Sequence, residues 1–147
     1  MMLLLDIGNS RIKWALIKDR HQASSGVFDQ IESGSLLPMF ADIAVPSRIL
    51  VSNVAGDVVA AQVQAVGAAW GRAVEFVSAK SGQCGVRNGY VHPQRLGSDR
   101  WVALIAAWHE VRGACLVVTC GTATTVDALS AQGEFLGGLI LPGVDMM

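Results

Sequence analysis

One stretch of the sequence surrounds a tight turn with side chains that could bind a phosphate and a metal ion. In residues 3–17, LLLDIGNSRIKWALI, two apolar runs flank a Gly-Asn turn, with Asp6, Asn9, Ser10 and Lys13 around it. Glycine lets backbone N–H groups approach an anion, and asparagine and serine add donors. A carboxylate near phosphates could hold Mg²⁺, and a lysine could contact their oxygens. Taken alone, the stretch also fits an ordinary β-hairpin.

A second stretch repeats this order. Residues 116–129, LVVTCGTATTVDAL, again combine an apolar strand, a Gly-polar turn and a second strand. Two such turns facing one cleft would suit a polyphosphate. Neither has the Walker pattern, and no G-x-G-x-x-G follows a strand, so the usual P-loop and Rossmann sites are not indicated. The residues alone support phosphate binding and two structural hairpins about equally.

The tetrapeptide GSDR, residues 97–100, carries groups suited to an acceptor substrate. Asp99 could take the proton of an alcohol, and the planar fork of Arg100 suits a carboxylate. The N-terminus of a helix beginning here would also favour an anion. Ser-Asp is equally a common helix cap, and this tetrapeptide alone favours that structural interpretation.

The elements that must position these residues follow from hydrophobic periodicity and turn signals. Strands are predicted at residues 3–7, 12–18, 23–28, 48–54, 73–79, 114–119, 124–129 and 133–143. A short helix or loop is expected over 31–43, and a long functional loop over 80–95. Helices are expected over 56–71 and 99–112. This order predicts an α/β fold.

Particular residues are expected to pack or to cap. The first helix is expected because Val58, Ala61, Val66 and Ala69 lie near helical spacing. The second helix should be capped by Ser98 and closed by Gly113. The four tryptophans are expected in the core or an interface, with two of them, seven residues apart, on one helix face. They are Trp14, Trp70, Trp101 and Trp108.

Composition limits the class of protein. The chain has 147 residues, of which 52% are hydrophobic and 16% charged, as in a packed protein rather than a disordered one. A net charge of −1 indicates neither nucleic-acid binding nor a polybasic membrane contact. The apolar runs are shorter than the roughly 20 residues of a spanning helix, and the N-terminus does not fit a signal peptide. We therefore expect a cytoplasmic protein with no nucleic acid or membrane partner.

The cysteines and histidines do not suggest a metal site. The three cysteines lack the spacing of metal ligands, and the three histidines lie far apart. Cys115 and Cys120 flank an apolar run and are expected to be small buried side chains. Asp127 follows in the next strand, and only a weak case exists for its contact with a metal.

Together, four motifs resemble one family. DIGNSRIK resembles the first phosphate motif of the acetate kinase, sugar kinase, Hsp70 and actin superfamily, in the form D-x-G-N-[ST]-x-x-K of type III pantothenate kinases. NGYVHPQRLGSDRW, CGTATTVD and GGLILPG follow in that family's order and approximate spacing. The family also includes Bvg accessory factor-like proteins, first described as factors for virulence gene expression.

The resemblance implies ATP-dependent phosphorylation of pantothenate to 4'-phosphopantothenate, the first step of coenzyme A biosynthesis. It implies a duplicated ribonuclease H-like (actin-like ATPase) α/β fold, with residues 1–113 as the first half and 114–147 as the start of the second. Family members continue well past GGxIxPG, so the chain resembles a truncated one. The remainder would hold a pantothenate-binding threonine and much of a homodimer contact.

The resemblance also assigns roles to residues. It implies that ATP is bound by Asp6, Ile7, Gly8, Asn9, Ser10, Arg11, Ile12 and Lys13, and by Gly121 and Thr122. Asp6 would hold Mg²⁺ through water, and Asp99 would be the catalytic proton acceptor. Pantothenate would be contacted by Tyr90, Gly97, Ser98, Asp99 and Arg100. Asn88, Pro93 and Leu96 would shape the loop.

One position departs from the family pattern. Many members have an aspartate two residues before the second phosphate-turn glycine, where it binds a monovalent cation, and this chain has Thr119. A hydroxyl cannot offset a cation's charge, so dependence on K⁺ or NH₄⁺ stays open. Two alternatives also stay open: a catalytically idle regulatory or partner-binding protein on this fold, and a related kinase for another small alcohol.

Overall fold

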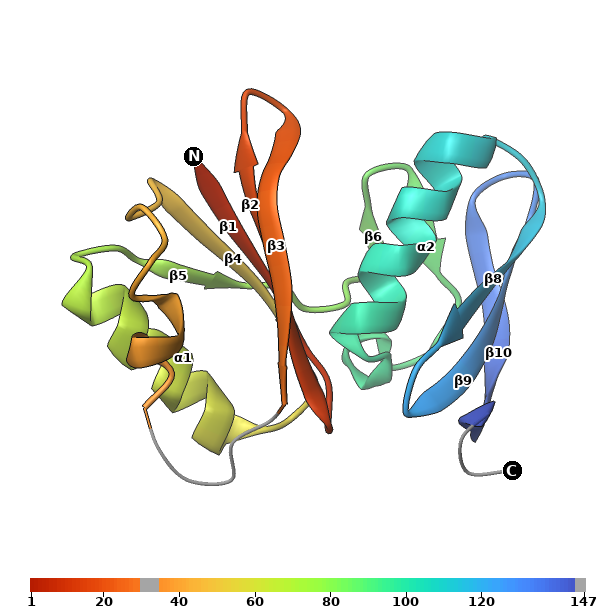
Figure 1. Cartoon of the computed structure of the whole chain (residues 1–147). Coiled ribbons are helices and arrows are strands. Elements are labelled where there is room, and N and C mark those ends of the chain that lie inside the picture. Colours follow the sequence, from red (N-terminus) through yellow and green to blue (C-terminus); the bar gives the residue numbers. More distant parts are fainter. Residues whose placement is uncertain (30–34, 145–147) are drawn as a thin grey trace. The chain divides into compact units, whose positions relative to one another are not determined.

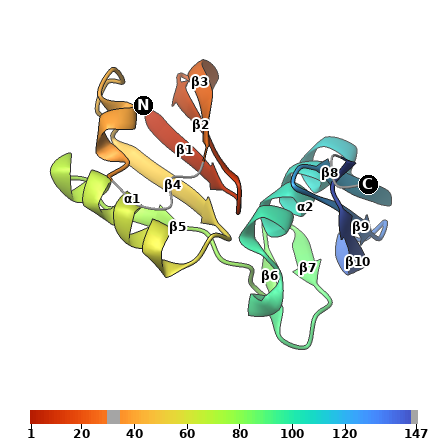
Figure 2. The same ribbon diagram turned by 60° about the horizontal axis from the view of Figure 1, so that its bottom comes forward.

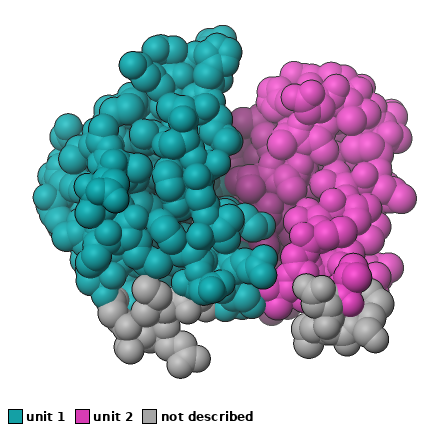
Figure 3. All heavy atoms as spheres, viewed as in Figure 1, with its two compact units in different colours: residues 1–77 teal, residues 78–147 magenta. Residues whose placement is uncertain are grey.

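The computed structural model describes residues 1–29 and 35–144. The chain forms two compact units, Met1–Val77 and Ser78–Met147 (Figure 3). These units are a property of this chain. The predicted division at residue 113 concerns the halves of a duplicated fold in the complete protein, and it stays a prediction.

Unit 1 is built on a five-stranded mixed sheet in the order β3-β2-β1-β4-β5 (Figure 1). Its strands are β1 (Met2–Ile7), β2 (Arg11–Lys18), β3 (His21–Asp29), β4 (Arg48–Asn53) and β5 (Val74–Phe76). The first three are joined as antiparallel hairpins, whereas β4 and β5 run parallel to β1. Asp19 and Arg20, both at positive φ, form the two-residue turn between β2 and β3, as hairpin twist requires. The strands predicted in this unit are confirmed.

One face of this sheet is covered by α1 (Asp57–Ala69) and the 3₁₀-helix η1 (Leu37–Phe40), as Figures 1 and 2 show. Their buried side chains join those of the strands in a single apolar cluster, with Trp14 and Trp70 packed against it. The short helix expected within 31–43 is thus confirmed at η1, and residues 31–34 lie outside the described part. The cluster packs this face of the sheet against α1, whereas the opposite face carries the exposed Asp6 and Lys13 together with the half-buried Leu4 and Leu50.

The predicted first helix is confirmed as α1, but of the four residues whose spacing predicted it only Val66 is buried. The helix buries Val59, Val63, Val66 and Gly67, while Val58 is 69% exposed. The helix has apolar residues on almost every side, so periodicity could not choose between neighbouring registers. The choice follows from the tertiary contacts of the helix, which place Val59, Val63 and Val66 in the core cluster of unit 1.

Unit 2 contains a second five-stranded sheet, in the order β6-β7-β10-β9-β8. Its strands are β6 (Gly82–Gln83), β7 (Val86–Asn88), β8 (Cys115–Cys120), β9 (Ala123–Leu129) and β10 (Glu134–Pro142). All pairings are antiparallel except β7 with β10. The expected loop over 80–95 is therefore wrong in part, because it contains the β6–β7 hairpin as well as η2 (Pro93–Arg95). The predicted strands that became β8, β9 and β10 are confirmed.

Helix α2 (Ser98–Val111) lies across one face of this sheet, where it contacts β7, β8 and β9 (Figures 1 and 2). On the side of α2 that faces the sheet, Trp101 and Leu104 are fully buried, and Trp108 is half-buried. The predicted packing of the two helix tryptophans is therefore confirmed. The opposite face of the sheet exposes large apolar side chains. These are Leu116, Val118, Leu139 and Leu141.

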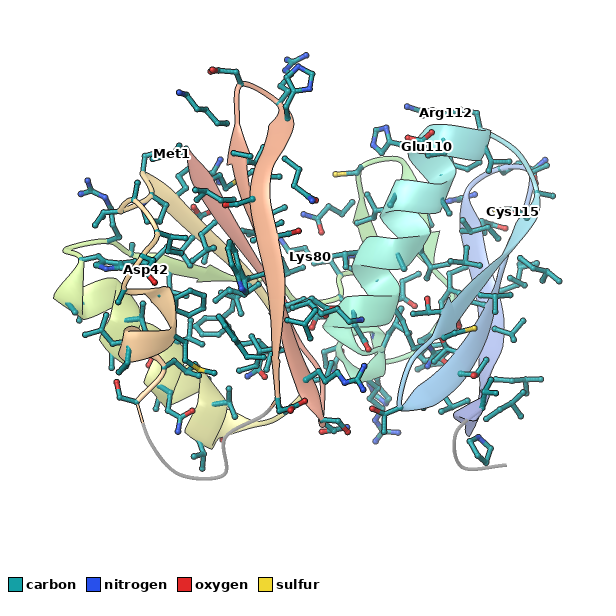
Figure 4. The ribbon with its side chains drawn as sticks, viewed as in Figure 1. Met1, Asp42, Lys80, Glu110, Arg112 and Cys115 are labelled. Atoms are coloured by element: carbon teal, nitrogen blue, oxygen red, sulfur yellow. The ribbon has the colours of Figure 1, made fainter. Side chains whose placement is uncertain are left out.

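Both predicted ends of α2 need correction. The N-cap residue is Gly97, and Ser98 is the first residue of the helix. At the other end Arg112, not Gly113, adopts the left-handed conformation, with a φ of 52°. Figure 4 shows Glu110 and Arg112 at this end of the helix and Cys115 in the strand that follows.

The prediction for the cysteines is also wrong in part. All three are free, but Cys120 is exposed and Cys115 only half-buried, because β8 is an edge strand of its sheet. Among the described residues, none of the helices has the length and apolar character needed to cross a membrane.

Candidate functional site

The first phosphate turn lies in unit 1, between β1 and β2. Ile7 pairs with Ile12, and the Gly8 N–H donates to the Arg11 carbonyl at 3.0 Å, so Asn9 and Ser10 form the exposed tip. The side chains of Ile7 and Ile12 are buried in the core of unit 1. Any contact that these two make with a nucleotide must therefore use their backbone.

Asp6 and Lys13 face each other across this hairpin. They are direct partners in the β1–β2 register, and Lys13 Nζ lies 3.7 Å from Asp6 Oδ2. Their side chains are about half exposed, at 50% and 55%, on the face opposite the core. On the other side of Asp6, β4 places Ser52, which is buried. Sequence analysis missed Ser52, because strand pairing over this separation leaves no local signal.

The carboxylate of Asp6 fits a hydrated magnesium ion. Mg²⁺ keeps several waters and commonly takes one or two carboxylates together with substrate phosphates. Among the described residues, no group of three or more His, Cys, Asp or Glu side chains could form an all-protein cage. The single accessible carboxylate of Asp6 is enough for a Mg²⁺ ion whose other ligands are water and phosphate oxygens, and the Lys13 ammonium beside it can contact those phosphates.

The second phosphate turn, in unit 2, joins β8 and β9. Gly121 N–H donates to the Ala123 carbonyl at 3.0 Å, which leaves Thr122 at the tip. Gly143 packs directly on this turn and donates to the Thr122 carbonyl at 3.1 Å. A Cβ on Gly143 would lie 2.6 Å from the Gly121 carbonyl oxygen and closer still to that of Thr122. The last glycine of GGLILPG is therefore required by close backbone packing, and Thr119, two residues before Gly121, is exposed.

The acceptor motif places Asp99 and Arg100 in the first turn of α2. Asp99 is half-buried, and one of its carboxylate oxygens accepts the backbone N–H of Arg100 at 2.8 Å. Gly97 precedes the helix, and Ser98 is 7% exposed. The carboxylate thus sits at the positive end of the helix, where a negative charge is favoured.

Arg100 is buried and paired with Asp127 of β9. Its Nε lies 3.2 and 3.1 Å from the two carboxylate oxygens, and its Nη2 lies 2.5 Å from Oδ1. The side chains are only 10% and 2% exposed. Hydrogen bonds to Asp127 raise the pKa of the Arg100 guanidinium above its usual value, against the lowering effect of burial, and a smaller contribution comes from Tyr90. Asp127 is therefore an ion-pair partner of Arg100 in this structure.

Tyr90 and Arg100 both lie against the ring of Phe135, a residue that sequence analysis did not name. The ring centroids of Tyr90 and Phe135 are 5.0 Å apart, and Arg100 Cζ lies 5.8 Å from the centroid of Phe135. Asn88 accepts the Tyr90 N–H at 3.0 Å and donates to the Pro93 carbonyl at 3.2 Å, so it shapes the loop as predicted. Two of the predicted substrate residues are thus neighbours.

The predicted residues fall into two groups. Asp6 to Lys13 belong to unit 1, and the remaining predicted residues belong to unit 2. Within unit 1 the structure brings together Asp6 and Lys13, and within unit 2 it brings together Tyr90 and Arg100. Phe135 lies outside the four motifs, and Asp127 was considered only for a weak metal contact. Their contacts with Tyr90 and Arg100 were missed because those partners are distant in the chain.

Comparison with solved structures defines the class of fold. The chain superposes with a TM-score of 0.54 on a putative 2-dehydro-3-deoxygalactonokinase from Sinorhizobium meliloti, at 14% identity over 95% of this chain and 53% of that one. It superposes with a TM-score of 0.50 on the ethanolamine utilization protein EutJ from Carboxydothermus hydrogenoformans, at 12% identity over 96% and 51%. The predicted α/β fold of the actin-like ATPase and sugar kinase class is confirmed.

Sequence comparison defines the family within that class. Residues 2–147 match the family model described as type III pantothenate kinase, and the chain belongs to this family. It is 48% identical over its whole length to a type III pantothenate kinase of Nitrosospira multiformis, and 46% identical to one of Aromatoleum aromaticum. It covers 56% and 61% of these two relatives, so it spans little more than half of their length.

Proposed function

We propose that the complete protein transfers the γ-phosphoryl group of ATP to pantothenate, giving 4'-phosphopantothenate, the first step of coenzyme A biosynthesis. Membership of the family supports this activity. The observation that carries the proposal is the cluster in unit 2, where Tyr90 and the cationic Arg100 adjoin Asp99 in the first turn of α2. A base next to a carboxylate-binding arginine suits an acceptor that has both an alcohol and a carboxylate.

In this reaction the primary hydroxyl oxygen of pantothenate forms a bond to the γ-phosphorus of ATP. The bond between that phosphorus and the bridging oxygen breaks, and ADP leaves with its electron pair. Asp99 accepts the proton of the hydroxyl as the new bond forms. Arg100, with Tyr90 beside it, binds the carboxylate end of pantothenate. Gly97 and Ser98, at the N-terminus of α2, contact the substrate from the start of the helix.

The nucleotide would be held by the two glycine turns. Asn9 and Ser10 would donate to phosphate oxygens in the first turn, and Thr122 in the second. Gly8 and Gly121, whose N–H groups donate within their own turns, would let the phosphates approach the backbone closely. Lys13 would offset part of their charge. Bound through water at Asp6, Mg²⁺ would neutralise the charge on the phosphates.

Further properties of the complete protein follow as proposals. Because Thr119 offers an exposed hydroxyl and no charge, we expect turnover to depend only weakly on K⁺ or NH₄⁺. The variant Thr119→Asp should increase that dependence. We also expect the protein to be a cytoplasmic homodimer. Light scattering of the purified protein would test the oligomeric state.

The test is pantothenate-dependent release of ADP from Mg-ATP, made with this chain and with the whole product of its reading frame. Asp99→Asn should lower kcat by about 100- to 10,000-fold, the usual contribution of a general base. Asp57→Asn is a matched control, because Asp57 is also an acidic residue in the first turn of a helix. It should leave kcat unchanged.

The outcomes separate the candidate functions. ADP release that requires pantothenate and is lost in Asp99→Asn supports the proposal. Release with another small alcohol, but not with pantothenate, would identify a different kinase. Nucleotide binding without turnover by the whole product would instead favour a regulatory protein.

A further inference from the structure

The buried pair of Arg100 and Asp127 is unusual for a purely structural feature. Removing two charges from water is costly, and well-packed apolar side chains in their place are often as stable or more so. Both side chains are nonetheless nine-tenths or more buried, inside unit 2 and beside Tyr90 and Phe135. The position of the pair indicates that it orients the guanidinium of Arg100 rather than adding to stability.

Asp127 occupies one edge of that guanidinium. Its oxygens accept from Nε and Nη2 of Arg100, the two nitrogens that form the side-on fork. Arginine has five N–H hydrogens, so the contact with Asp127 leaves the two on Nη1 and one on Nη2 for Tyr90 and for a further acceptor. Those three include the end-on fork, whose geometry suits two parallel hydrogen bonds to another carboxylate.

The surroundings fix the pair in this orientation. Gly138 of β10 is the direct strand partner of Asp127. A Cβ on Gly138 would lie 2.8 Å from Arg100 Nη2 and closer still to Asp127 Oδ1. The pair therefore fits only against bare backbone, with the ring of Phe135 near the guanidinium carbon. This explains the second glycine of the GGLILPG motif.

We propose that Asp127 is a positioning residue, which holds the plane of Arg100 so that its end-on fork is preset for the carboxylate of the acceptor substrate. This inference rests on the proposed function. An arginine side chain that is already ordered loses little conformational freedom when the substrate binds. An Asn at this position would keep one oxygen acceptor, but it would lose the charge and turn its NH2 group toward an N–H donor of Arg100, which would shift the guanidinium.

The test compares two acceptors in the whole product of the reading frame. One is pantothenate, and the other is its analogue with a hydroxymethyl group in place of the carboxylate. Asp127→Asn should raise KM for pantothenate about 10-fold, as is typical when the partner orienting a ligand-binding side chain is lost. It should change kcat much less and leave KM for ATP and for the analogue unchanged. A merely structural role would affect both acceptors alike.

Two further variants guard the conclusion. Glu134→Gln removes the carboxylate from another arginine pair on the same sheet, Arg87 with Glu134 at 2.6 Å, whose side chains are 65% and 43% exposed. It should leave both acceptors unaffected. If Asp127→Asn does not fold, Asp127→Glu keeps the charge but moves the carboxylate by one methylene, and it should raise KM for pantothenate selectively.

Each outcome decides a separate point. An unchanged or lower KM for pantothenate in the Asp127 variants, or an equal rise for both acceptors, overturns the positioning role while the kinase stands. If the wild type binds pantothenate without turning it over, only the proposed activity falls, and the same comparison is made with dissociation constants. A wild type that neither binds nor phosphorylates pantothenate overturns both proposals.

Discussion

Each unit holds an ion pair that includes a residue proposed to bind a ligand, and the two pairs differ in exposure. Asp6 and Lys13 in unit 1 are half exposed and 3.7 Å apart, on the face of the sheet opposite the apolar core. Arg100 and Asp127 in unit 2 are almost completely buried, with several short contacts. A hydrated pair can rearrange around a metal ion and phosphates, whereas a buried pair presents one fixed geometry.

The interiors of the two units also differ in whether they contain charged side chains. The core of unit 1 is an aliphatic and aromatic cluster beneath α1 and η1. The fully buried side chains of unit 2 include Asp127 beside Trp101, Leu104 and Phe135. Unit 2 therefore relies on a polar contact inside its core, while the charged residues that the structure describes in unit 1 lie outside its core. Perturbing one pair or core at a time tests this contrast.

The largest effect is expected for Asp127→Ala, because it leaves the buried guanidinium of Arg100 without a partner. The free energy of unfolding should fall by about 3–5 kcal/mol. Urea unfolding followed by circular dichroism measures the change. The double variant Arg100→Met/Asp127→Leu should recover most of the loss, since it removes both charges. A loss below about 1 kcal/mol for Asp127→Ala would mean that burial adds nothing to this pair.

A smaller effect is expected from the apolar core of unit 1. Val63→Ala removes a side chain that is 1% exposed, and should lower the free energy of unfolding by about 1.5–3 kcal/mol through lost burial and a cavity. Val58→Ala is the matched control on the same helix, and its change should stay within about 0.5 kcal/mol. Thermal unfolding compares the two. Equal losses would contradict the packing of α1 through Val63.

The exposed pair of unit 1 should contribute still less. Asp6→Asn is expected to lower the free energy of unfolding by no more than about 1 kcal/mol, since both side chains are half in water. The difference from wild type should shrink further in high salt, which screens surface charges. Unfolding at low and high ionic strength checks this. A loss as large as that of Asp127→Ala, unaffected by salt, would contradict the contrast between the units.

The smallest effect concerns a surface pair with ideal geometry. Arg48 donates from Nε and Nη2 to the two oxygens of Glu75 at 3.0 and 2.9 Å, and these hydrogen bonds hold the pKa of Glu75 below its usual value. A pKa lowered by folding stabilises above the unfolded value, and the contribution is lost as the pH falls through the folded value. Thermal midpoints of wild type and Glu75→Gln should differ slightly at neutral pH and converge in acid. A difference that persists in acid would exclude the ion pair as its cause.

Local signals accounted for much of the fold. The hairpin of β1 and β2, the strands β8 to β10 and both helices follow from alternation, helical periodicity and turn residues near each element. The β6–β7 hairpin was missed because it is very short and lies in a stretch rich in turn residues. The ends of α2 were misplaced by one residue each, since the caps depend on backbone conformation at Gly97 and Arg112.

The candidate site was predictable only where motifs carried it. Asp6, Lys13, Tyr90 and Arg100 were named from the sequence, and the structure pairs them within their units. Phe135 was not, because an apolar residue in a strand carries no mark of a substrate cluster. These roles depend on contacts across the sheet rather than on neighbours in the chain.

The sequence by itself determined the order of strands and helices, the two glycine turns and the family motifs, because each depends on a few adjacent residues. Only the tertiary structure decided that Arg100 meets Asp127, 27 residues away, or that α1 buries Val63 and exposes Val58. Burial and pairing are set by the side chains that other elements bring to a position. Those elements lie far along the chain, so no local pattern can encode the contact.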